Sequence, residues 1–445
     1  MMKNRTYHIE TFGCQMNIYD SAIVESLLQR TGFITAVSRE QAGLFLINTC
    51  SVRKHAEQRV FALLSQYKKL KDDNPEMRIG LIGCIAQIQG AELLKMFPHL
   101  DFIAGPDDYR RIPEIVCNFE SPKTALISCL SSEDYDDVKP YQSGPCAGVA
   151  VMRGCDNFCS YCVVPYARGR ERSRPLVSLI DEFHRLSDSG VKEITLLGQN
   201  VNSYRDNDND FAALLYAAAK VDGIERIRFM TSHPKDLKEN IILAMAANRK
   251  IAPHLHLPLQ SGSDKILHKM NRGYTAEKYL NLITMARKII PDISITTDII
   301  VGFPGESDAD FQQTMDIVNS VRFDDTFTYR YSVRPGTKAA AFIDDVPEQL
   351  KIERLEEIIS AVRRIGRENL EKLIGKTFTV LIENESRKDS DWWMGRTEHN
   401  RIAVIPKNSC FIGDFTNFTA GEISGFTIRA EIKEDLHAPA ALHEA

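Results

Sequence analysis

The chain has 445 residues, of which 43% are hydrophobic and 26% are charged. These fractions are typical of a globular protein and exclude a disordered, collagen-like or coiled-coil chain. The 55 Lys and Arg residues against 60 Asp and Glu residues give a formal net charge of −5. The chain as a whole therefore does not attract nucleic acid, and any RNA contact must come from a local basic patch.

The sequence also indicates a cellular setting. No stretch approaches the roughly 18 uncharged apolar residues that a membrane span needs. Met1–Glu10 has no apolar segment of the kind that follows the charged start of a signal peptide. We therefore expect a cytoplasmic protein that binds no membrane. Because structural disulfides are rare in a reducing compartment, the ten cysteines need another explanation.

Residues 4–120 read as alternating strands and helices. Extended or apolar runs predict strands at Thr6–Phe12, Gly43–Asn48, Arg78–Gly83 and Asp101–Ala104. Helices are predicted between them at Ile18–Arg30, Arg53–Leu70 and Glu92–Phe97. Such alternation predicts a doubly wound, parallel α/β domain. Residues 121–145 break the periodicity with acids, prolines and a glycine, so we predict a linker there.

Residues 146–373 contain a second alternating series. The predicted strands are Gly148–Met152, Glu193–Leu197, Arg226–Met230, His254–Leu259, Ser294–Ile299 and Thr326–Tyr331. Six βα units predict a partial TIM-type (β/α)6 barrel, followed by a long amphipathic helix at Glu348–Leu373. Short alternating strands then predict a small all-β barrel over residues 374–437.

Cys155, Cys159 and Cys162 form a C-x3-C-x2-C motif in the loop after the first strand of the predicted barrel. Three thiolates within eight residues can converge on one metal centre. Zinc would need a fourth ligand, which Cys146 is able to supply in principle. A 4Fe–4S cluster held by three cysteines leaves one iron open for chemistry. The spacing favours iron–sulfur over zinc.

Cys14, Cys50 and Cys84 each follow one of the first three predicted strands. The carboxyl ends of parallel strands meet at one edge of a doubly wound sheet, where ligands bind. We therefore expect a second three-cysteine cluster, the alternative being three small buried hydrophobic side chains. The remaining cysteines are expected to be structural or incidental: Cys117, Cys129, Cys146 and Cys410.

The C-x3-C-x2-C motif with an aromatic residue before its last cysteine resembles the radical S-adenosylmethionine superfamily. The pairing of both cysteine sets with a C-terminal β-barrel resembles the methylthiotransferases, whose last domain is an RNA-binding TRAM barrel. Five segments resemble the tRNA-modifying MiaB type rather than the ribosomal-protein branch, RimO: Thr11–Asn17, Arg153–Arg174, His256–Ser263, Met270–Thr275 and Asp298–Glu306.

This resemblance implies two 4Fe–4S clusters, one on each cysteine set, and S-adenosylmethionine as both methyl donor and radical source. The radical would abstract hydrogen from C2 of an isopentenyl-adenosine beside the tRNA anticodon, and a methylthio group would follow. An aromatic C–H is neither acidic nor activated, which is the chemical reason to expect a radical.

The implied partners are the tRNA anticodon stem-loop and a low-potential electron donor such as a flavodoxin or ferredoxin, and we expect a monomer. Two alternatives keep the chemistry and change the target, to a ribosomal-protein aspartate or a threonylcarbamoyl-adenosine in tRNA. A third is a zinc-stabilised RNA-binding protein without catalysis.

Polar residues at or near the ends of the barrel strands are expected to bind the cofactor, although each also has a structural alternative as a turn former, cap or ion pair. These residues are Gln199, Asn200, Ser232, Asp298 and Arg330.

Arginines alternate directly after the second cysteine set, at positions 168, 170, 172 and 174. Arg153–Arg174 contains five arginines against two acids, a net charge of +3. We expect Arg168, Arg170, Arg172 and Arg174 to contact RNA phosphates. The alternatives are a solvated loop, ion pairs with the acidic linker, or contacts with the cofactor carboxylate.

Several further residues need a decision between binding and packing. We expect His254 and His256 to pack or to form hydrogen bonds rather than to bind a metal. Trp392 and Trp393, placed in a loop, are candidates for stacking on bases, and Arg396 and Arg401 for a local RNA-binding face. Phe158 and Tyr161 are expected to shield the cluster or to pack at the barrel mouth.

Overall fold

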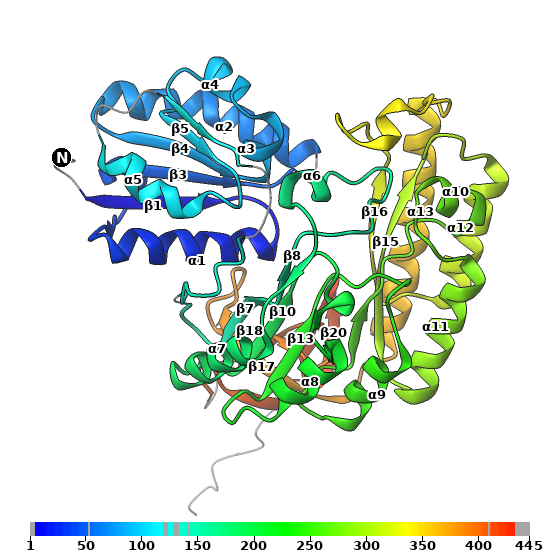
Figure 1. The fold of residues 1–445 in the computed structure, drawn as a ribbon. Coiled ribbons are helices and arrows are strands. Elements are labelled where there is room, and N and C mark those ends of the chain that lie inside the picture. The colour runs from blue at the N-terminus through cyan, green and yellow to red at the C-terminus, as the bar shows by residue number, and fades with distance from the viewer. Residues whose placement is uncertain are drawn as a thin grey trace, which may run out of the picture. The chain divides into compact units, whose positions relative to one another are not determined.

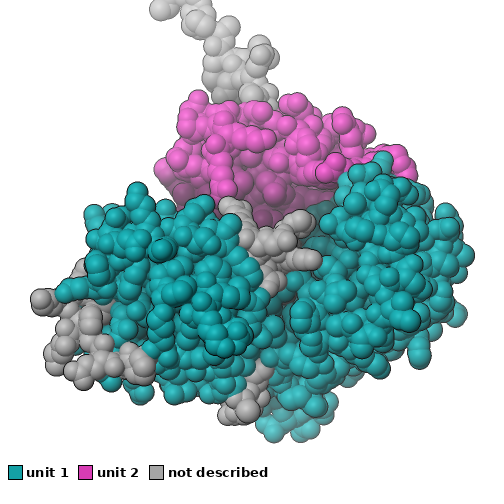
Figure 2. Space-filling view, turned by 90° about the horizontal axis from the view of Figure 1, so that it is seen from above, with its two compact units in different colours: residues 1–362 teal, residues 363–445 magenta. Residues whose placement is uncertain are grey.

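The computed structural model describes residues 5–51, 54–118, 123–128, 133–140, 142–407 and 410–431. The chain forms two compact units, residues 1–362 and residues 363–445 (Figure 2). The first unit contains the predicted α/β domain and the predicted partial barrel, and the second contains the small β-barrel. In the described residues, no helix is long and apolar enough to cross a membrane.

The N-terminal sheet has six parallel strands in the order β2-β1-β3-β4-β5-β6. Their bounds are β1 Thr6–Thr11, β2 Ile34–Thr35, β3 Leu44–Thr49, β4 Arg78–Gly83, β5 Phe102–Ala104 and β6 Thr124–Leu126. The chain reverses its direction of winding between β1 and β3, which makes the domain doubly wound as predicted. The sequence did not reveal β2 and β6, because strands of two and three residues are too short to show a period.

Helices cover both faces of this sheet (Figure 1). One layer contains α1 (Gln15–Arg30) and α5 (Ile112–Cys117), and the other contains α2 (Lys54–Asp73), α3 (Cys84–Gln89) and α4 (Glu92–Met96). Every residue of β3 is buried, as expected of a strand covered on both faces.

Part of the predicted linker belongs to the N-terminal domain. Strand β6 lies within residues 121–145 and extends the sheet. Tyr135 and Val138, each 1% exposed, join the core formed with α1. The Tyr135 hydroxyl donates a hydrogen bond to the Pro106 carbonyl at 2.8 Å and accepts one from the Tyr109 amide at 3.0 Å. The sequence did not reveal the packing of Tyr135, because a single aromatic residue in an acidic segment gives no periodic pattern.

Six parallel strands form the predicted partial barrel, in two runs ordered β13-β10-β7 and β14-β15-β16. A parallel bridge between Ile227 and Ile251 joins β13 to the segment before β14. The bounds are β7 Cys146–Ala150, β10 Glu193–Leu197, β13 Arg226–Phe229, β14 His254–His256, β15 Ser294–Val301 and β16 Asp325–Arg330. Two short antiparallel strand pairs accompany these strands. They are β8 (Met152–Arg153) with β9 (Arg172–Ser173), and β11 (Arg205–Asp206) with β12 (Asn209–Asp210).

Most helices of this region lie outside these strands, whereas α6 lies against α3 of the N-terminal domain (Figure 1). Their bounds are α6 Val164–Arg168, α7 Leu176–Asp188, α8 Phe211–Ala219, α9 Glu239–Ala247, α10 Asp264–Lys269, α11 Ala276–Ile289, α12 Asp308–Val321 and α13 Glu348–Glu371. Single 3-10 turns occur at Arg39–Gln41, Tyr109–Arg111, Val201–Ser203 and Lys338–Ala341.

The second unit contains a closed barrel in the order β17-β18-β19-β21-β20. The bounds are β17 Thr377–Glu385, β18 Trp392–Thr397, β19 Ile402–Pro406, β20 Phe415–Ser424 and β21 Thr427–Ala430. Trp392 and Trp393 lie in a strand, so their placement in a loop was wrong. Trp392 is buried in the barrel core with Arg429 4.4 Å from its ring. The Trp393 indole donates a hydrogen bond to the Cys410 carbonyl at 2.9 Å.

The Tyr135→Ala substitution tests whether residues 133–140 stabilise the N-terminal domain. We expect the free energy of unfolding to fall by about 3–5 kcal/mol, since a buried aromatic side chain is removed. Urea unfolding followed by circular dichroism measures this change. Val37→Ala, at a side chain that is 91% exposed, is the control, with an expected change within about 0.5 kcal/mol. Equal stability of the two variants would contradict the packed arrangement.

Candidate active site

The structure brings Cys14, Cys50 and Cys84 to one edge of the N-terminal sheet. Cys14 precedes α1, Cys50 follows β3, and Cys84 begins α3 directly after β4. Strands β1, β3 and β4 are neighbours, and adjacent strands lie about 4.8 Å apart. The β1/β3 boundary is also where the winding reverses, which is the place where open α/β sheets bind ligands.

The three thiols influence one another. A hydrogen bond with Cys50 is the main reason why the pKa of Cys14 falls to about 6, and the positive charge of Arg168 lowers it further. Burial raises the pKa of Cys84, while Arg168 opposes this effect. Cys14 is therefore largely a thiolate at neutral pH, the form that binds metals.

Two glycines let the backbone approach the cysteines closely. Gly13 has a φ of +137°, and a Cβ there would lie 2.4 Å from the Cys50 Cβ. Gly83 has a φ of +95°, and its Cβ would lie 2.5 Å from the Asn48 side-chain oxygen. Both positions exclude any larger residue, so the glycine before Cys14 and the glycine before Cys84 are part of the site.

Buried asparagines connect the loops that carry Cys14 and Cys50. Asn17 donates hydrogen bonds to Asn48 Oδ1 at 2.9 Å and to the Thr49 carbonyl at 3.0 Å. Asn48 donates in return to the Asn17 carbonyl at 2.9 Å. The sequence analysis did not assign these residues a role, although Asn17 ends the Thr11–Asn17 motif.

The second cysteine set lies between β8 and β9, which pair as a hairpin. Within it, the Cys155 amide donates to the Gly169 carbonyl at 3.2 Å and the Cys162 amide to the Cys159 carbonyl at 2.9 Å. Burial raises the pKa of Cys155 to about 11 and that of Cys162 to about 12, and neighbouring thiols add to both shifts. These two thiols are therefore protonated at neutral pH.

A buried arginine faces this set. Arg272 Nη1 donates a hydrogen bond to Cys159 Sγ at 3.3 Å, and Nη2 donates to the Pro258 carbonyl at 3.1 Å. The sequence analysis quoted Arg272 inside the Met270–Thr275 motif without a role. Tyr161 packs edge-on against Phe303, as expected for a residue at the barrel mouth. Phe158 instead stays 38% exposed with a φ of +44°.

The contacts bring the cysteines of each set near one another, but the side chains are not arranged as the ligands of a metal ion. Within the described ranges, no three His, Cys, Asp or Glu side chains are gathered closely enough to hold a metal ion. Cys146 is not suited to be a fourth ligand of the second set. It begins β7, about 13 Å from the carboxyl end of that strand at 3.3 Å per residue, and Cys155 follows the carboxyl end.

Unpaired polar atoms gather at the carboxyl ends of three barrel strands. Among the described residues, five buried side-chain atoms there have no hydrogen-bond partner: Gln199 Oε1, Asn200 Oδ1, Ser232 Oγ, His233 Nε2 and Gln260 Oε1. Buried polar atoms are rarely left unpaired, so this rim fits a polar ligand. Gln199, Asn200 and Ser232 were proposed from the sequence, while His233 and Gln260 were missed.

The other two proposed cofactor ligands have protein partners. Asp298 lies inside β15, with its Oδ2 3.6 Å from His256 Nε2. Arg330 ends β16 and forms an ion pair with Glu348 at 3.2 Å. The hydroxyl of Thr296 is hydrogen bonded to His254 at 3.1 Å and to His256 at 3.0 Å, which confirms the hydrogen-bonding role predicted for these histidines.

The alternating arginines are mostly internal, which corrects their expected role as phosphate contacts. Arg168 and Arg174 are 4% and 1% exposed, and Arg172 forms an ion pair with Asp107 at 2.6 Å. Arg174 binds Asp136 at 2.8 Å and Glu182 at 2.7 Å. A buried guanidinium that is paired with carboxylates is not accessible to RNA phosphates. Arg170, whose side chain is 73% exposed and bound to Asp156, remains a predicted RNA contact.

Asp20 of α1 connects the two cysteine sets. Its Oδ1 accepts a hydrogen bond from Arg153 Nη2 and its Oδ2 one from Arg168 Nη2, both at 2.8 Å. Arg153 and Arg168 lie on either side of Cys155 and Cys162 in the sequence, and α1 begins next to Cys14. No local pattern identifies Asp20, because its partners are 133 and 148 residues away.

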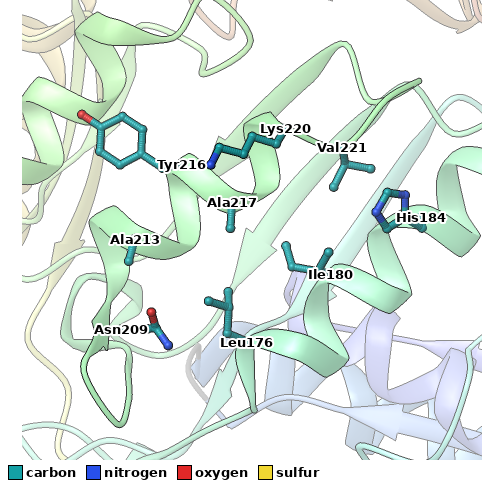
Figure 3. A pocket seen from close by; sticks show the side chains of 9 residues that line it. All are labelled: Leu176, Ile180, His184, Asn209, Ala213, Tyr216, Ala217, Lys220 and Val221. Carbon is teal, nitrogen blue, oxygen red and sulfur yellow. The ribbon is translucent and has the colours of Figure 1, made fainter.

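A separate groove of about 540 Å³ lies between α7 and α8 (Figure 3). Its lining residues are Leu176, Ile180, His184, Asn209, Ala213, Tyr216, Ala217, Lys220 and Val221. They include no cysteine, and most of them lie on the two helices outside the barrel strands. The groove is therefore distinct from the rim that carries the unpaired polar atoms.

Three protein-family models match the chain. The Radical SAM superfamily matches residues 149–318, Uncharacterized protein family UPF0004 matches residues 6–105, and the TRAM domain matches residues 371–433. Among solved structures, the radical S-adenosylmethionine methyltransferase TsrM from Kitasatospora setae has a TM-score of 0.58 at 14% identity. The match covers 76% of this chain and 75% of TsrM, and it supports the fold alone.

Curated relatives match nearly from end to end. The tRNA-2-methylthio-N(6)-dimethylallyladenosine synthase of Chlorobium limicola is 45% identical over 97% of this chain and 99% of the relative. The synthase of the same name from Chloroherpeton thalassium is 45% identical over 96% of this chain and 95% of the relative. The chain therefore belongs to this family of radical S-adenosylmethionine methylthiotransferases.

Proposed function

We propose that this chain methylthiolates C2 of N6-isopentenyl (dimethylallyl) adenosine next to the anticodon of tRNA. The observation that carries the proposal is the presence of two cysteine sets within one compact unit, connected through Asp20. The names of the full-length relatives support tRNA as the target. They favour it over a ribosomal-protein aspartate and over threonylcarbamoyl-adenosine, and the TRAM match agrees with an RNA substrate.

Radical SAM membership implies a 4Fe–4S cluster and S-adenosylmethionine. We assign the cluster to Cys155, Cys159 and Cys162, where together with S-adenosylmethionine it supplies a 5′-deoxyadenosyl radical. Arg272 contributes a positive charge and a hydrogen bond to Cys159. Gln199, Asn200 and Ser232 supply unpaired polar atoms that suit the amino acid end of the cofactor. Asp298 and Arg330 remain proposals for the same role.

The N-terminal cysteines are assigned to an auxiliary 4Fe–4S cluster that carries the sulfur to be transferred. Cys14 is available as a thiolate, and Asn17 and Asn48 hold its loop against that of Cys50. Cys50 and Cys84 are buried, which limits the access of water to a reactive sulfur, whereas Cys14 is exposed. A low-potential donor such as a flavodoxin or ferredoxin supplies electrons. A tRNA-modifying activity agrees with a location in the cytoplasm, which we propose together with a monomeric state.

Arg170, Phe158 and Tyr166 form an exposed group beside the second cysteine set. The Arg170 guanidinium lies 5.4 Å from the Phe158 ring centre, and Tyr166 meets Phe158 edge-on at 6.5 Å. Phe158 is 38% exposed and Tyr166 is 46% exposed. Exposed aromatic rings next to a cation suit unstacked bases and phosphates of single-stranded RNA, so we assign the anticodon loop to this surface.

The two cysteine sets should be separately required for activity. Mass spectrometry of tRNA nucleosides from a host that lacks the protein should show isopentenyl-adenosine without its methylthio group, with restoration by the wild-type chain. Neither Cys14→Ala nor Cys155→Ala should restore the product, whereas Cys117→Ala, outside both sets, should. An unchanged nucleoside profile in the deleted host, with no paralogue present, would defeat the assignment.

Iron analysis separates the enzyme from a zinc protein. Two 4Fe–4S clusters correspond to about eight irons per chain. The variant with Cys14, Cys50 and Cys84 all replaced by alanine should keep about half. Stoichiometric zinc without iron would instead support a non-catalytic RNA-binding protein.

Loading of the second cysteine set should depend on pH. Cys155 and Cys162 have pKa values of about 11 and 12, so metal binding must displace their protons. At a fixed concentration of free ferrous iron and sulfide under anaerobic conditions, iron incorporation should therefore rise as the pH increases from 7 to 9. The measurement uses the variant without Cys14, Cys50 and Cys84, in which this set alone binds a cluster. Incorporation that does not change with pH would contradict the prediction.

Arg170→Gln should weaken binding of an anticodon stem-loop several-fold, with a salt dependence smaller by about one phosphate contact. Fluorescence anisotropy at several salt concentrations measures both quantities. Arg39→Gln is the matched control, because Arg39 is also exposed and bound to an acid, Glu10, at 2.9 Å. Equal affinities for the two variants would remove Arg170 from the RNA-binding surface.

A further inference from the structure

Two buried arginines meet the single carboxylate of Asp20, so one of their two positive charges relies on the neighbouring thiols for its counter-charge. Asp20 is fully buried, and Arg153 and Arg168 are 1% and 4% exposed. Two guanidinium groups therefore share one carboxylate. Asp107, which also interacts with Arg153, is itself bound to Arg172, so including that pair leaves the balance unchanged. Burial of a charge without a counter-charge is strongly unfavourable. The second positive charge therefore needs an anion here, either the Cys14 thiolate or a cluster that the thiols bind.

The contacts locate the excess charge at Arg168. The guanidinium of Arg153 lies over the Tyr135 ring, 4.9 Å from its centre, and a ring face accommodates a cation. Arg168 lies instead beside the thiols of Cys84 and Cys14. Arg153 Nε and Arg168 Nη1 are both buried without a hydrogen-bond partner among the described side-chain N and O atoms. Arg168 is in addition hydrogen bonded to Cys84 and carries its charge beside that thiol, so the charge that shares Asp20 with Arg153 lies at the N-terminal cysteine set.

Arg168 reaches the N-terminal cysteines from the other domain. It ends α6, six residues after Cys162, and Asp20 of α1 holds its Nη2. Arg272 likewise lies at the thiols of the second set, where it donates a hydrogen bond to Cys159. Each cysteine set thus has one buried arginine at its thiols. The two differ in that Arg168 is contributed by the loop that carries the opposite set.

We propose that Arg168 is the counter-charge of the auxiliary cluster, a guanidinium that the radical-forming domain inserts beside the cluster and that Asp20 holds in place. This inference rests on the proposed function, because it requires a cluster on Cys14, Cys50 and Cys84. A 4Fe–4S cluster with three thiolate ligands is anionic, and its reduction adds a further negative charge. A buried cation beside it therefore stabilises the reduced form and raises the reduction potential.

The test measures the midpoint potential of the auxiliary cluster by potentiometric titration with electron paramagnetic resonance. The parent chain has Cys155, Cys159 and Cys162 replaced by alanine, so that the signal comes from one cluster. Arg168→Gln should shift the potential to a more negative value, and Arg168→Lys, which keeps the charge, should shift it less. Arg174→Gln is the matched control: Arg174 is also a buried arginine between two carboxylates. Its main electrostatic partners are Tyr19, Glu182 and Asp136 rather than the N-terminal thiols, so this variant should leave the potential unchanged.

Asp20→Asn separates the charge effect from structural damage. It removes a negative charge beside the cluster and keeps Arg168, so the potential should move in the positive direction, opposite to the Arg168→Gln shift. The Asp20→Asn variant also tests the proposal by itself if the Arg168→Gln variant does not fold. Shifts of the same sign in both variants, or an Arg168→Gln shift no larger than that of Arg174→Gln, would overturn the inference. A parent chain that binds no iron would instead refute the auxiliary cluster, and with it the proposed function.

Discussion

The ion pairs of Asp20 with Arg153 and Arg168 are the interaction on which the arrangement of the first unit depends. They join a helix of the N-terminal domain to both sides of the loop that carries the second cysteine set. Buried ion pairs contribute little to net stability, because desolvation offsets the attraction. Their geometry is strict, however, and any displacement leaves a charge unpaired. The acid and its two arginines therefore define how the two domains meet, while shared apolar packing, which includes Ala150 and Leu197 of the barrel, supplies the stabilisation.

The two cysteine sets differ in the environment of one thiol, since burial raises the pKa of Cys84, Cys155 and Cys162 whereas the pKa of Cys14 is lowered. At the N-terminal sheet, a hydrogen bond from Cys50 and the nearby charge of Arg168 lower the pKa of Cys14 and favour its thiolate form. In the barrel loop, burial keeps Cys155 and Cys162 protonated. This contrast agrees with different tasks for the two clusters. One would hold a reactive sulfur between two domains, and the other would hold a cofactor whose cleavage must await the substrate.

Large parts of the fold were predictable from local patterns. The apolar runs of β3 and β4 and the amphipathic spacing of α13 identified those elements with almost their final bounds. The failures share a cause, since each feature depends on a partner that is distant in sequence. Strand β6 pairs only because β5 is present, and Tyr135 is ordered by the Tyr109 amide and the Pro106 carbonyl. Trp392 and Trp393 were predicted to lie in a loop because the residues around them are polar, although they belong to a strand of the closed barrel.

The amino-acid sequence by itself determined the three-part architecture, the two cysteine sets and the family, because these follow from periodicity and from motifs of a few adjacent residues. Tertiary structure alone decided what the arginines do. A row of alternating arginines looks the same in sequence whether it faces solvent or carboxylates, and the acids that bind Arg168, Arg172 and Arg174 come from other parts of the chain. Only folding brings Asp20 against the loop of the second domain, and the electrostatic field at the N-terminal cysteine set depends on that contact.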